Sequence, residues 1–362
     1  SLIKKILIIF FLLFPISNSF GEATLTHVQT VEFDDGAQNQ NNLIAGIEFN
    51  KDGTKLFTSS ANFSNPGNIM EFNLSTPYDI SSRTYAGDGE RCTMPEVLKT
   101  VYDLELNHDG TRLFVVTRDA TNGADKDKIF RYDLTTPYDI STCAFAQQTT
   151  NLDHADNLND SAAGNFTDGA GHSNVRLQGI EFNNKGTKLF LSWFGNGDTV
   201  KLLEYTLSTP YDITSLQLVT TAGIDVGSTT AAKVNNSAGM RFSANGKRIF
   251  IISHSDNSGI SQISLTNAFD TSSFVLDGKF DLHNATPSNG QARGVSFNSS
   301  GLKLYIGNDE NDGDVDEIME YDLVCPFTIF SATCPSITEN KDRTGMAIAQ
   351  IEIAKRTIDQ ST

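Results

Sequence analysis

The sequence predicts an all-β protein, a β-propeller of five four-stranded blades closed by an N-terminal strand and followed by a C-terminal helix. A segment of the form Gly-Ile-Glu-Phe-Asn-x-x-Gly-Thr-Lys-Leu-Phe returns five times along the chain. Three of these units continue into a Ser/Thr-Thr-Pro-Tyr-Asp-Ile segment. Self-similarity of this kind is typical of repeat architectures, and its spacing favours a propeller.

Each unit opens with a predicted β-hairpin. Apolar and polar residues alternate at its start, as on a half-buried strand. A glycine stands seven residues after each opening position, and a positive φ angle, which is costly for any residue with a Cβ, explains its recurrence. These glycines are Gly53, Gly110, Gly186, Gly246 and Gly301.

A variable loop and two further strands complete each unit. The third strands are expected at residues 69–74, 129–134, 202–207, 260–265 and 318–323. The Pro-Tyr-Asp segments that follow are turns, because proline cannot donate to a ladder and aspartate can bind its own backbone. A fourth strand follows, for example at residues 274–280.

The two ends of the repeat predict how the ring closes. The fifth unit stops after its third strand, whereas residues 25–34 resemble the fourth strand of unit four. An N-terminal strand therefore completes the last blade, which removes two exposed strand edges. Six blades remain the alternative if residues 325–340 contain a degenerate strand pair.

The hairpin Phe-Asn-x-x-Gly-Thr-Lys-Leu-Phe resembles the YVTN-type and lactonase-like propeller repeats of secreted bacterial proteins. The Leu-Ser-Thr-Pro-Tyr-Asp-Ile version resembles repeats of marine bacterial and phage proteins. The resemblance covers most of residues 24–333. Because the shared motifs are structural turns, it implies a fold far more than an activity.

The N-terminus predicts export. Lys4 and Lys5 precede an apolar run at residues 6–14, with Ser17 and Ser19 placed for cleavage. We expect a signal peptide at residues 1–19, with a signal anchor as the alternative, and a propeller at residues 20–340. The protein would then be secreted or reside in the cell envelope, in the periplasm or on the outer surface.

The remaining residues, 341–362, predict a helical tail or the start of a stalk. Its apolar positions alternate at spacings of four and three, as on an amphipathic helix. They are Ala347, Ile351, Ala354 and Ile358. The helix would pack on the propeller or lead to a coiled coil or a membrane anchor, the anchor resting on a resemblance to autotransporters.

The acidic balance bounds the partners. The formal net charge of −17 disfavours nucleic acid and anionic lipid, so a membrane would be reached only through a C-terminal anchor. Four cysteines in an exported chain are expected to be bridged. We favour Cys92 with Cys143, which lie at related places near the fourth strands of neighbouring blades, and Cys325 with Cys334, which are close together at the end of the last repeat.

Signals for catalysis are few. No His-Glu-x-x-His or Gly-x-Ser-x-Gly motif occurs, but a glutamate recurs on the opening strand of the first three units, where propeller hydrolases often place acids. These candidates are Glu48, Glu105 and Glu181. Seven residues later stand Lys55, Arg112 and Lys188. We favour ion pairs across the hairpin over a catalytic site, because structural charge pairs mimic sites.

One acidic run is a candidate calcium site. Its oxygen ligands would be Asp309, Asp312, Asp314 and Asp316. The spacing does not match the EF-hand pattern, and a solvated loop is the favoured alternative. No other cofactor is expected.

We therefore favour a non-catalytic recognition or scaffold module over an enzyme. Its unknown partner, a protein or a glycan, would bind the loops between second and third strands, which we call the loop face. The alternative is a propeller hydrolase of lactonase or glycosidase type using Glu48, Glu105 and Glu181. Acids that converge in an accessible central funnel would favour the enzyme, and pairing with Lys55, Arg112 and Lys188 the scaffold.

Overall fold

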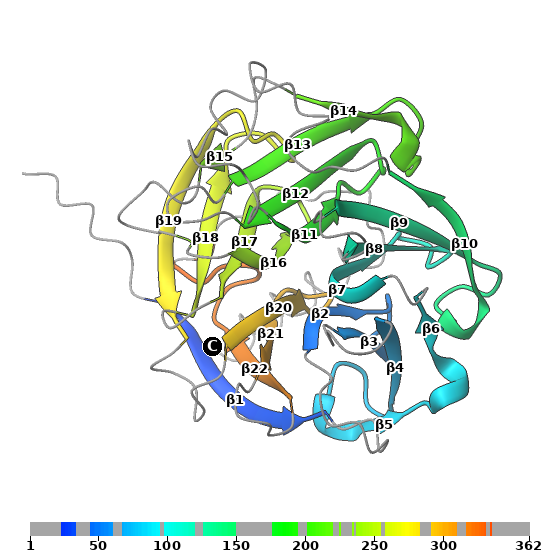
Figure 1. Ribbon diagram of the computed structural model, residues 1–362. Coiled ribbons are helices and arrows are strands. Elements are labelled where there is room, and N and C mark those ends of the chain that lie inside the picture. The colour runs from blue at the N-terminus through cyan, green and yellow to red at the C-terminus, as the bar shows by residue number, and fades with distance from the viewer. Residues whose placement is uncertain are drawn as a thin grey trace, which may run out of the picture.

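The computed structural model describes residues 23–33, 44–60, 67–94, 98–119, 126–149, 176–194, 201–219, 224–225, 234, 237–254, 258–282, 291–309, 316–330 and 334. Five antiparallel sheets form the blades of a propeller, which Figure 1 shows arranged around a central axis. The five-blade prediction is confirmed.

The strands of four blades follow one another in sequence. Blade 1 holds β2 (Ile44–Phe49), β3 (Lys55–Ser60), β4 (Asn68–Leu74) and β5 (Arg83–Tyr85), with β6 (Cys92–Thr93) also paired to β4. Blade 2 holds β7 (Leu98–Leu106), β8 (Arg112–Asp119), β9 (Lys126–Leu134) and β10 (Cys143–Gln148). Blade 3 holds β11 (Arg176–Phe182), β12 (Lys188–Phe194), β13 (Lys201–Leu207) and β14 (Leu216–Leu218), with β15 (Ile224–Asp225) paired to β13. Blade 4 holds β16 (Ser237–Phe242), β17 (Arg248–Ser253), β18 (Gly259–Leu265) and β19 (Phe274–Asp281).

Blade 5 joins the two ends of the ring. It holds β20 (Gln291–Phe297), β21 (Lys303–Asp309), β22 (Glu317–Leu323) and the N-terminal strand β1 (Leu25–Glu32), which pairs antiparallel with β22. Figure 1 shows β1 along the outer edge of this blade. Closure by an N-terminal strand is confirmed.

The hairpin between first and second strands is locked by a glycine and an aromatic ring. Each turn glycine has a positive φ angle, as predicted. A Cβ on Gly186 would lie 2.4 Å from the Tyr211 ring, so space also excludes a side chain there. The aromatic residue at the Tyr position of the following turn has a positive φ and donates its N–H to the glycine carbonyl, in every blade. These aromatic residues are Tyr78, Tyr138, Tyr211, Phe269 and Phe327.

The aspartate of the Pro-Tyr-Asp-Ile segment caps a short 3-10 helix. These helices are η1 (Ile80–Ser82), η4 (Ile140–Thr142) and η5 (Ile213–Ser215). The Asp79 carboxylate accepts the Ser81 N–H at 3.0 Å, and the isoleucine after each aspartate is buried. The segment is therefore turn chemistry, as the sequence predicts.

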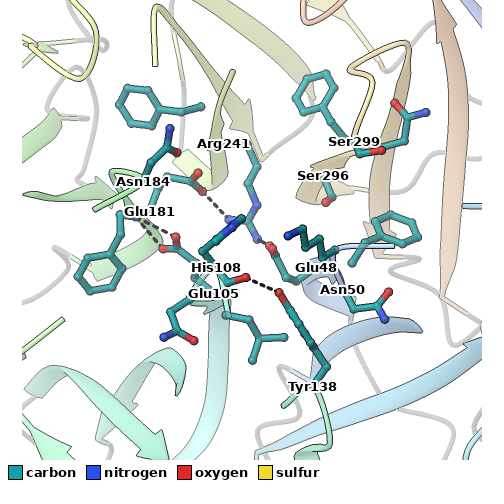
Figure 2. Close-up of a pocket in the computed structure, with 18 of the residues that line it drawn as sticks. Glu48, Asn50, Glu105, His108, Tyr138, Glu181, Asn184, Arg241, Ser296 and Ser299 are labelled. Carbon is teal, nitrogen blue, oxygen red and sulfur yellow. Dashed lines mark hydrogen bonds and ion pairs between the residues drawn. The ribbon is translucent and has the colours of Figure 1, made fainter. Parts of the chain in front are cut away.

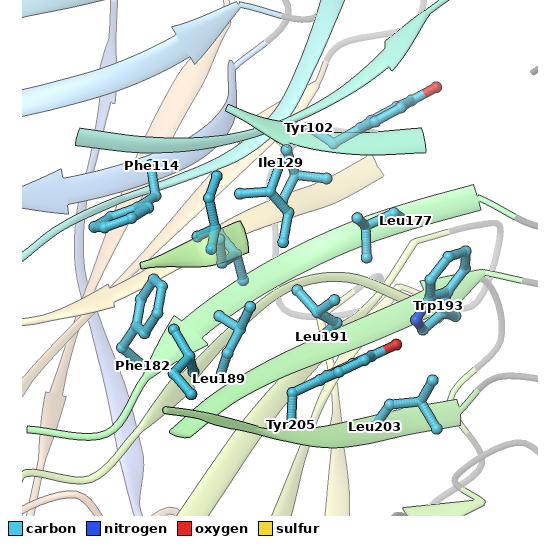
Figure 3. Close-up of a cluster of buried hydrophobic side chains, with 14 residues drawn as sticks. Tyr102, Phe114, Ile129, Leu177, Phe182, Leu189, Leu191, Trp193, Leu203 and Tyr205 are labelled. Atoms are coloured by element: carbon cyan, nitrogen blue, oxygen red, sulfur yellow. The ribbon is translucent and has the colours of Figure 1, made fainter. Parts of the chain in front are cut away.

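The core lies between neighbouring blades. Figure 3 shows Tyr102, Phe114 and Ile129 of blade 2 facing residues of blade 3, including Leu191 and Trp193. A second-strand aromatic of one blade packs on the first strand of the next, as Phe114 does on Phe182, with ring centroids 4.5 Å apart. Such contacts join the blades into one ring.

Both expected disulfides are formed. Cys92 bonds to Cys143 and links blades 1 and 2, and Cys325 bonds to Cys334. Within the described ranges, the protein contains no helix with the length and apolar character needed to span a bilayer. The expected signal peptide and the helix at residues 345–360 lie outside the described residues.

Candidate active site in the central funnel

The first strands of the five blades surround the axis. One position of the repeat, the third residue from the opening glycine, faces the centre from each blade. The residues at this position are Glu48, Glu105, Glu181, Arg241 and Ser296. The three glutamates that recur in the sequence therefore converge, and blades 4 and 5 add a cation and a hydroxyl.

These residues lie at the bottom of a cavity of about 140 Å³. The cavity opens on the face that carries the hairpin turns, which we call the hairpin face. Aromatic rings surround its wall, among them Phe49, Phe182, Tyr138 and Tyr211. The funnel thus combines charged groups at its floor with apolar rings around them.

Arg241 extends across the axis and joins four blades. Its Nη2 lies 2.7 Å from Glu48 Oε2, and its Nη1 lies 3.3 Å from Glu181 Oε2. Nη2 also donates to the carbonyl oxygens of Ile47 and Leu104, each at 3.0 Å. Figure 2 shows its side chain between Glu48 on one side and the other two glutamates on the opposite side.

The surrounding acids keep Arg241 charged. Burial alone would lower the pKa of its guanidinium, but Glu48, Asp103 and the other two glutamates outweigh that effect and raise the pKa. The residue is only 6% exposed. A permanent positive charge therefore sits at the centre of the ring.

The surroundings of Glu105 favour its uncharged form, in contrast to those of Arg241. Both of its oxygens accept the Phe182 N–H, at 3.0 and 2.8 Å, and the residue is 8% exposed. Burial, and then the negative charge of Glu181, raise the pKa of Glu105 well above its ordinary value, although Arg241 opposes the shift. A proton is therefore retained on this group at a pH where an ordinary glutamate has lost it.

Asp103 forms a deeper acidic layer on the same strand. Its Oδ1 accepts the Leu104 N–H at 2.9 Å and its Oδ2 accepts the Ile180 N–H at 3.2 Å. Burial raises the pKa of Asp103 to about 7, with Arg241 opposing the rise. The funnel floor thus holds several carboxyl groups around one guanidinium, and the pKa values of Asp103 and Glu105 are raised.

The expected ion pairs across the hairpin are wrong. Lys55 Nζ lies 2.6 Å from Glu71 on the third strand, and Lys188 Nζ lies 2.6 Å from Glu204. Arg112 donates to the Pro210 carbonyl at 3.4 Å. A residue on the second strand has diagonal neighbours on both the first and the third strand. These basic side chains point toward the third strand, away from the axis, where a carbonyl oxygen of the next blade is also within reach. Lys55, for example, donates to the Tyr138 carbonyl at 3.0 Å.

The acidic run proposed for calcium is only partly described. Asp316 is buried, and its Oδ2 accepts the Ile44 N–H at 2.9 Å, which gives it a structural role at the blade 5–blade 1 seam. The side chains of Asp309, Asp312 and Asp314 lie outside the described residues. Calcium binding by this run stays a prediction.

Arg241 and Asp103 are parts of the site that the sequence analysis did not select. Both stand where the repeat is broken, since Arg241 replaces the recurring glutamate and Asp103 replaces the opening glycine. First-strand residues of all blades surround the same axis, so two exceptions to the repeat on these strands come close together. Such exceptions in the sequence therefore indicate an asymmetric site at the axis.

No protein-family model and no curated protein matches the chain. Among solved structures, it is similar to the catalytic domain of an α-L-arabinofuranosidase from Coprinopsis cinerea, at 8% identity over 83% of this chain and 97% of that one, with a TM-score of 0.52. A periplasmic gluconolactonase from Pseudomonas aeruginosa matches at 14% identity over 73% and 64% of the two chains, with a TM-score of 0.44. An exo-β-1,3-galactanase from Phanerochaete chrysosporium matches at 10% over 82% and 64%, with a TM-score of 0.48.

The chain spans less than two thirds of the length of the lactonase and of the galactanase. At these identities the matches show the propeller fold, and the particular repeat families named above are not among them. These neighbours are a lactonase and glycosidases, and none of them supports the preference for a non-catalytic protein. The acids also converge in a cavity, and Lys55, Arg112 and Lys188, the partners expected for a scaffold, pair elsewhere, so that preference is not retained.

Proposed function

We propose that the protein is a hydrolase of glycosidase type that works outside the cytoplasm, with the central funnel as its active site. The observation that carries the proposal is that two carboxyl groups of one cavity have different surroundings. Glu105 is buried with a raised pKa, whereas Glu48 is paired with Arg241 at 2.7 Å. Pairs of carboxyl groups whose environments differ in this way are typical of acid–base catalysis.

Cleavage of a glycosidic bond needs one protonated carboxyl group and one carboxylate. Protonated Glu105 would give its proton to the leaving oxygen, since a carboxyl whose pKa is raised holds a proton near neutral pH. Glu48, held 2.7 Å from Arg241 Nη2, would act as the second carboxylate and activate water or attack the sugar. Glu181 lies next to Glu105 and would share its proton.

Arg241 would act as a positioning residue in this scheme. It binds Glu48 and Glu181 and is itself fixed by backbone carbonyls of blades 1 and 2. Groups held by rigid strands in this way need little reorganisation during the reaction. The exposed fraction of the Glu48 side chain is 21%, against 9% for Glu181, so Glu48 is the better placed of the two to meet a substrate.

The size of the cavity bounds the substrate. Pockets for drug-sized ligands have roughly 300–1,000 Å³, and this cavity has about 140 Å³. We infer that only a small part of the substrate, such as one terminal sugar unit, enters the funnel. The two disulfides support a site outside the cytoplasm, where such bonds persist.

The test uses leaving groups of different basicity. On unactivated glycosides, Glu105→Gln should lower kcat by about 10²–10⁴-fold, because the leaving oxygen needs a proton. On nitrophenyl glycosides, whose leaving group needs none, the variant should retain most of its activity and lose the fall in rate at high pH. Glu32→Gln on the exposed side of β1 is the matched control and should behave as wild type.

Glu48→Gln should abolish turnover of both substrate classes. Full activity of Glu105→Gln on unactivated glycosides would refute the assignment of the acid. Turnover of sugar lactones alone would refute the glycosidase and leave a lactonase.

A further inference from the structure

A second group of acids lies outside the funnel, at the seam between blades 1 and 2. It comprises Glu71 on β4, Glu90 in the 3-10 helix η2 (Asp88–Glu90) and Asp139 at the N-cap of η4. One carboxylate oxygen from each lies within 4.8 Å of the others. Three separate elements thus direct negative charge to one point.

Glu71 has a buried oxygen that is left over. Its Oε1 pairs with Lys55 Nζ at 2.6 Å. The Ile140 N–H is directed at the carboxylate, but Oε2 makes no hydrogen bond of ordinary geometry in the described part of the chain. The residue is only 2% exposed. A buried carboxylate oxygen without a partner is costly, so its retention points to a ligand.

The repeat supplies an internal comparison. The same lysine–glutamate pair recurs at two other seams, as Lys188 with Glu204 and Lys303 with Glu320. There the second oxygen is satisfied: Glu204 Oε2 accepts the Thr271 N–H and hydroxyl at 3.0 and 2.9 Å. Glu320 Oε2 accepts the Gln29 amide at 2.7 Å.

The blade 1–blade 2 seam departs from this pattern. Ile140 stands where blade 4 has Thr271, so no hydroxyl reaches Glu71. Asp139 occupies the same position as Asp270 of blade 4, and Glu90 is the additional carboxylate at this seam. Lys55 brings one positive charge to three negative ones. The Cys92–Cys143 disulfide, two residues after Glu90 and four after Asp139, ties the segments that carry two of the acids.

We propose that Glu71, Glu90 and Asp139 bind a calcium ion at this seam. Carboxylate oxygens are hard ligands, and calcium tolerates the irregular geometry of donors from three separate elements better than magnesium does. The ion would supply the missing partner of Glu71 and link blade 1 to blade 2. Glu90 and Asp139 are partly exposed, which gives the ion a way in.

Calcium titration by calorimetry tests the site in chelator-treated protein carrying Asp312→Asn and Asp314→Asn, which disable the other acidic run. We expect one calcium bound per chain. At calcium about 100-fold above its Kd, Tm should rise by about 4 °C. Glu90→Gln or Asp139→Asn should weaken binding by at least about tenfold, since each removes one charged ligand.

Two matched variants separate metal binding from loss of a turn. Asp212→Asn changes the equivalent N-cap in blade 3, where no acidic cluster is found among the described residues, and Asp88→Asn changes an acid in the same helix as Glu90. Both should bind calcium as the parent does. Absence of calcium binding at millimolar concentration, or equal affinity in Glu90→Gln, Asp139→Asn and the controls, would overturn the proposal.

Discussion

Asp103 shows how one residue can couple the funnel to the stability of the ring. Its pKa is about 7 in the folded protein, because burial penalises the charged form, against an ordinary value of 3.8. The folded state therefore binds this proton more tightly than the unfolded state. The stability that follows is fully present below pH 4 and is lost as pH rises through 7.

Asp103→Asn should remove this pH dependence. Between pH 5 and pH 8 the wild type should lose about 2–3 kcal/mol of unfolding free energy relative to the variant. Urea unfolding at the two pH values measures the difference. Asp212→Asn is the control, because hydrogen bonds from Thr214 lower the pKa of Asp212 and its effect lies below pH 4. Parallel stability curves for wild type and Asp103→Asn would contradict the prediction.

The single-residue errors of the sequence analysis have a common physical origin. Lys55 has a carboxylate on each neighbouring strand, Glu48 and Glu71, and the repeat pattern does not indicate with which of them it forms an ion pair. The choice depends on Tyr138, a residue of the next blade. Arg241 was missed for the same reason, since its partners come from blades 1, 2 and 3.

At the scale of the element, β1 is the strand whose removal tests the topology. The segment 24–34 contains β1, the outer strand of blade 5, and the Thr24 N–H also donates to the Ile329 carbonyl at 2.8 Å. Deleting them should lower Tm strongly, because β22 becomes an edge and Leu25 no longer packs on its cluster.

Adding the deleted segment as a peptide controls for nonspecific damage. A peptide of residues 24–34 should restore part of the lost Tm by adding a strand to the free edge. An unchanged Tm after the deletion would contradict the closure of the ring by β1.

Elements were the level at which the sequence was most informative. The alternation of apolar residues and the Gly53-type turns predicted hairpins because both are local properties of the backbone. The match between residues 25–34 and 274–281 predicted closure because equivalent strands of a propeller meet equivalent surroundings. The proposed calcium site is not local in this sense, because Glu71 and Asp139 come from different repeats and neither repeat alone contains all of its ligands.

At the scale of the whole molecule, the funnel and the variable loops lie at opposite ends of the strands. The cavity is lined by the hairpin turns that join β2 to β3, whereas the connections from β3 to β4 and from β12 to β13 leave the other ends of these strands. A partner on the loop face, which remains a proposal, would therefore not compete with a ligand in the funnel.

Replacing residues 61–66 and 195–200 by Asn-Gly turns should leave kcat/KM on a glycoside within about twofold of wild type, because rigid strands separate the two faces. The same replacement should abolish binding of a partner on the loop face. Kinetics on the purified variant, with Tm measured alongside, provide the check. A loss of kcat/KM of tenfold or more at unchanged Tm would show that these loops take part in turnover.

The closure of blade 5 also sets the order of events during synthesis. β1 is made first and β22 last, so the hydrogen bond from Gln29 to Glu320 spans 291 residues. Blades 1 to 4 each consist of consecutive strands and can pair as they emerge, but β1 must wait with an open edge until β22 has been made. The last blade is consequently a checkpoint of completeness, because a chain that terminates early can never seal its ring.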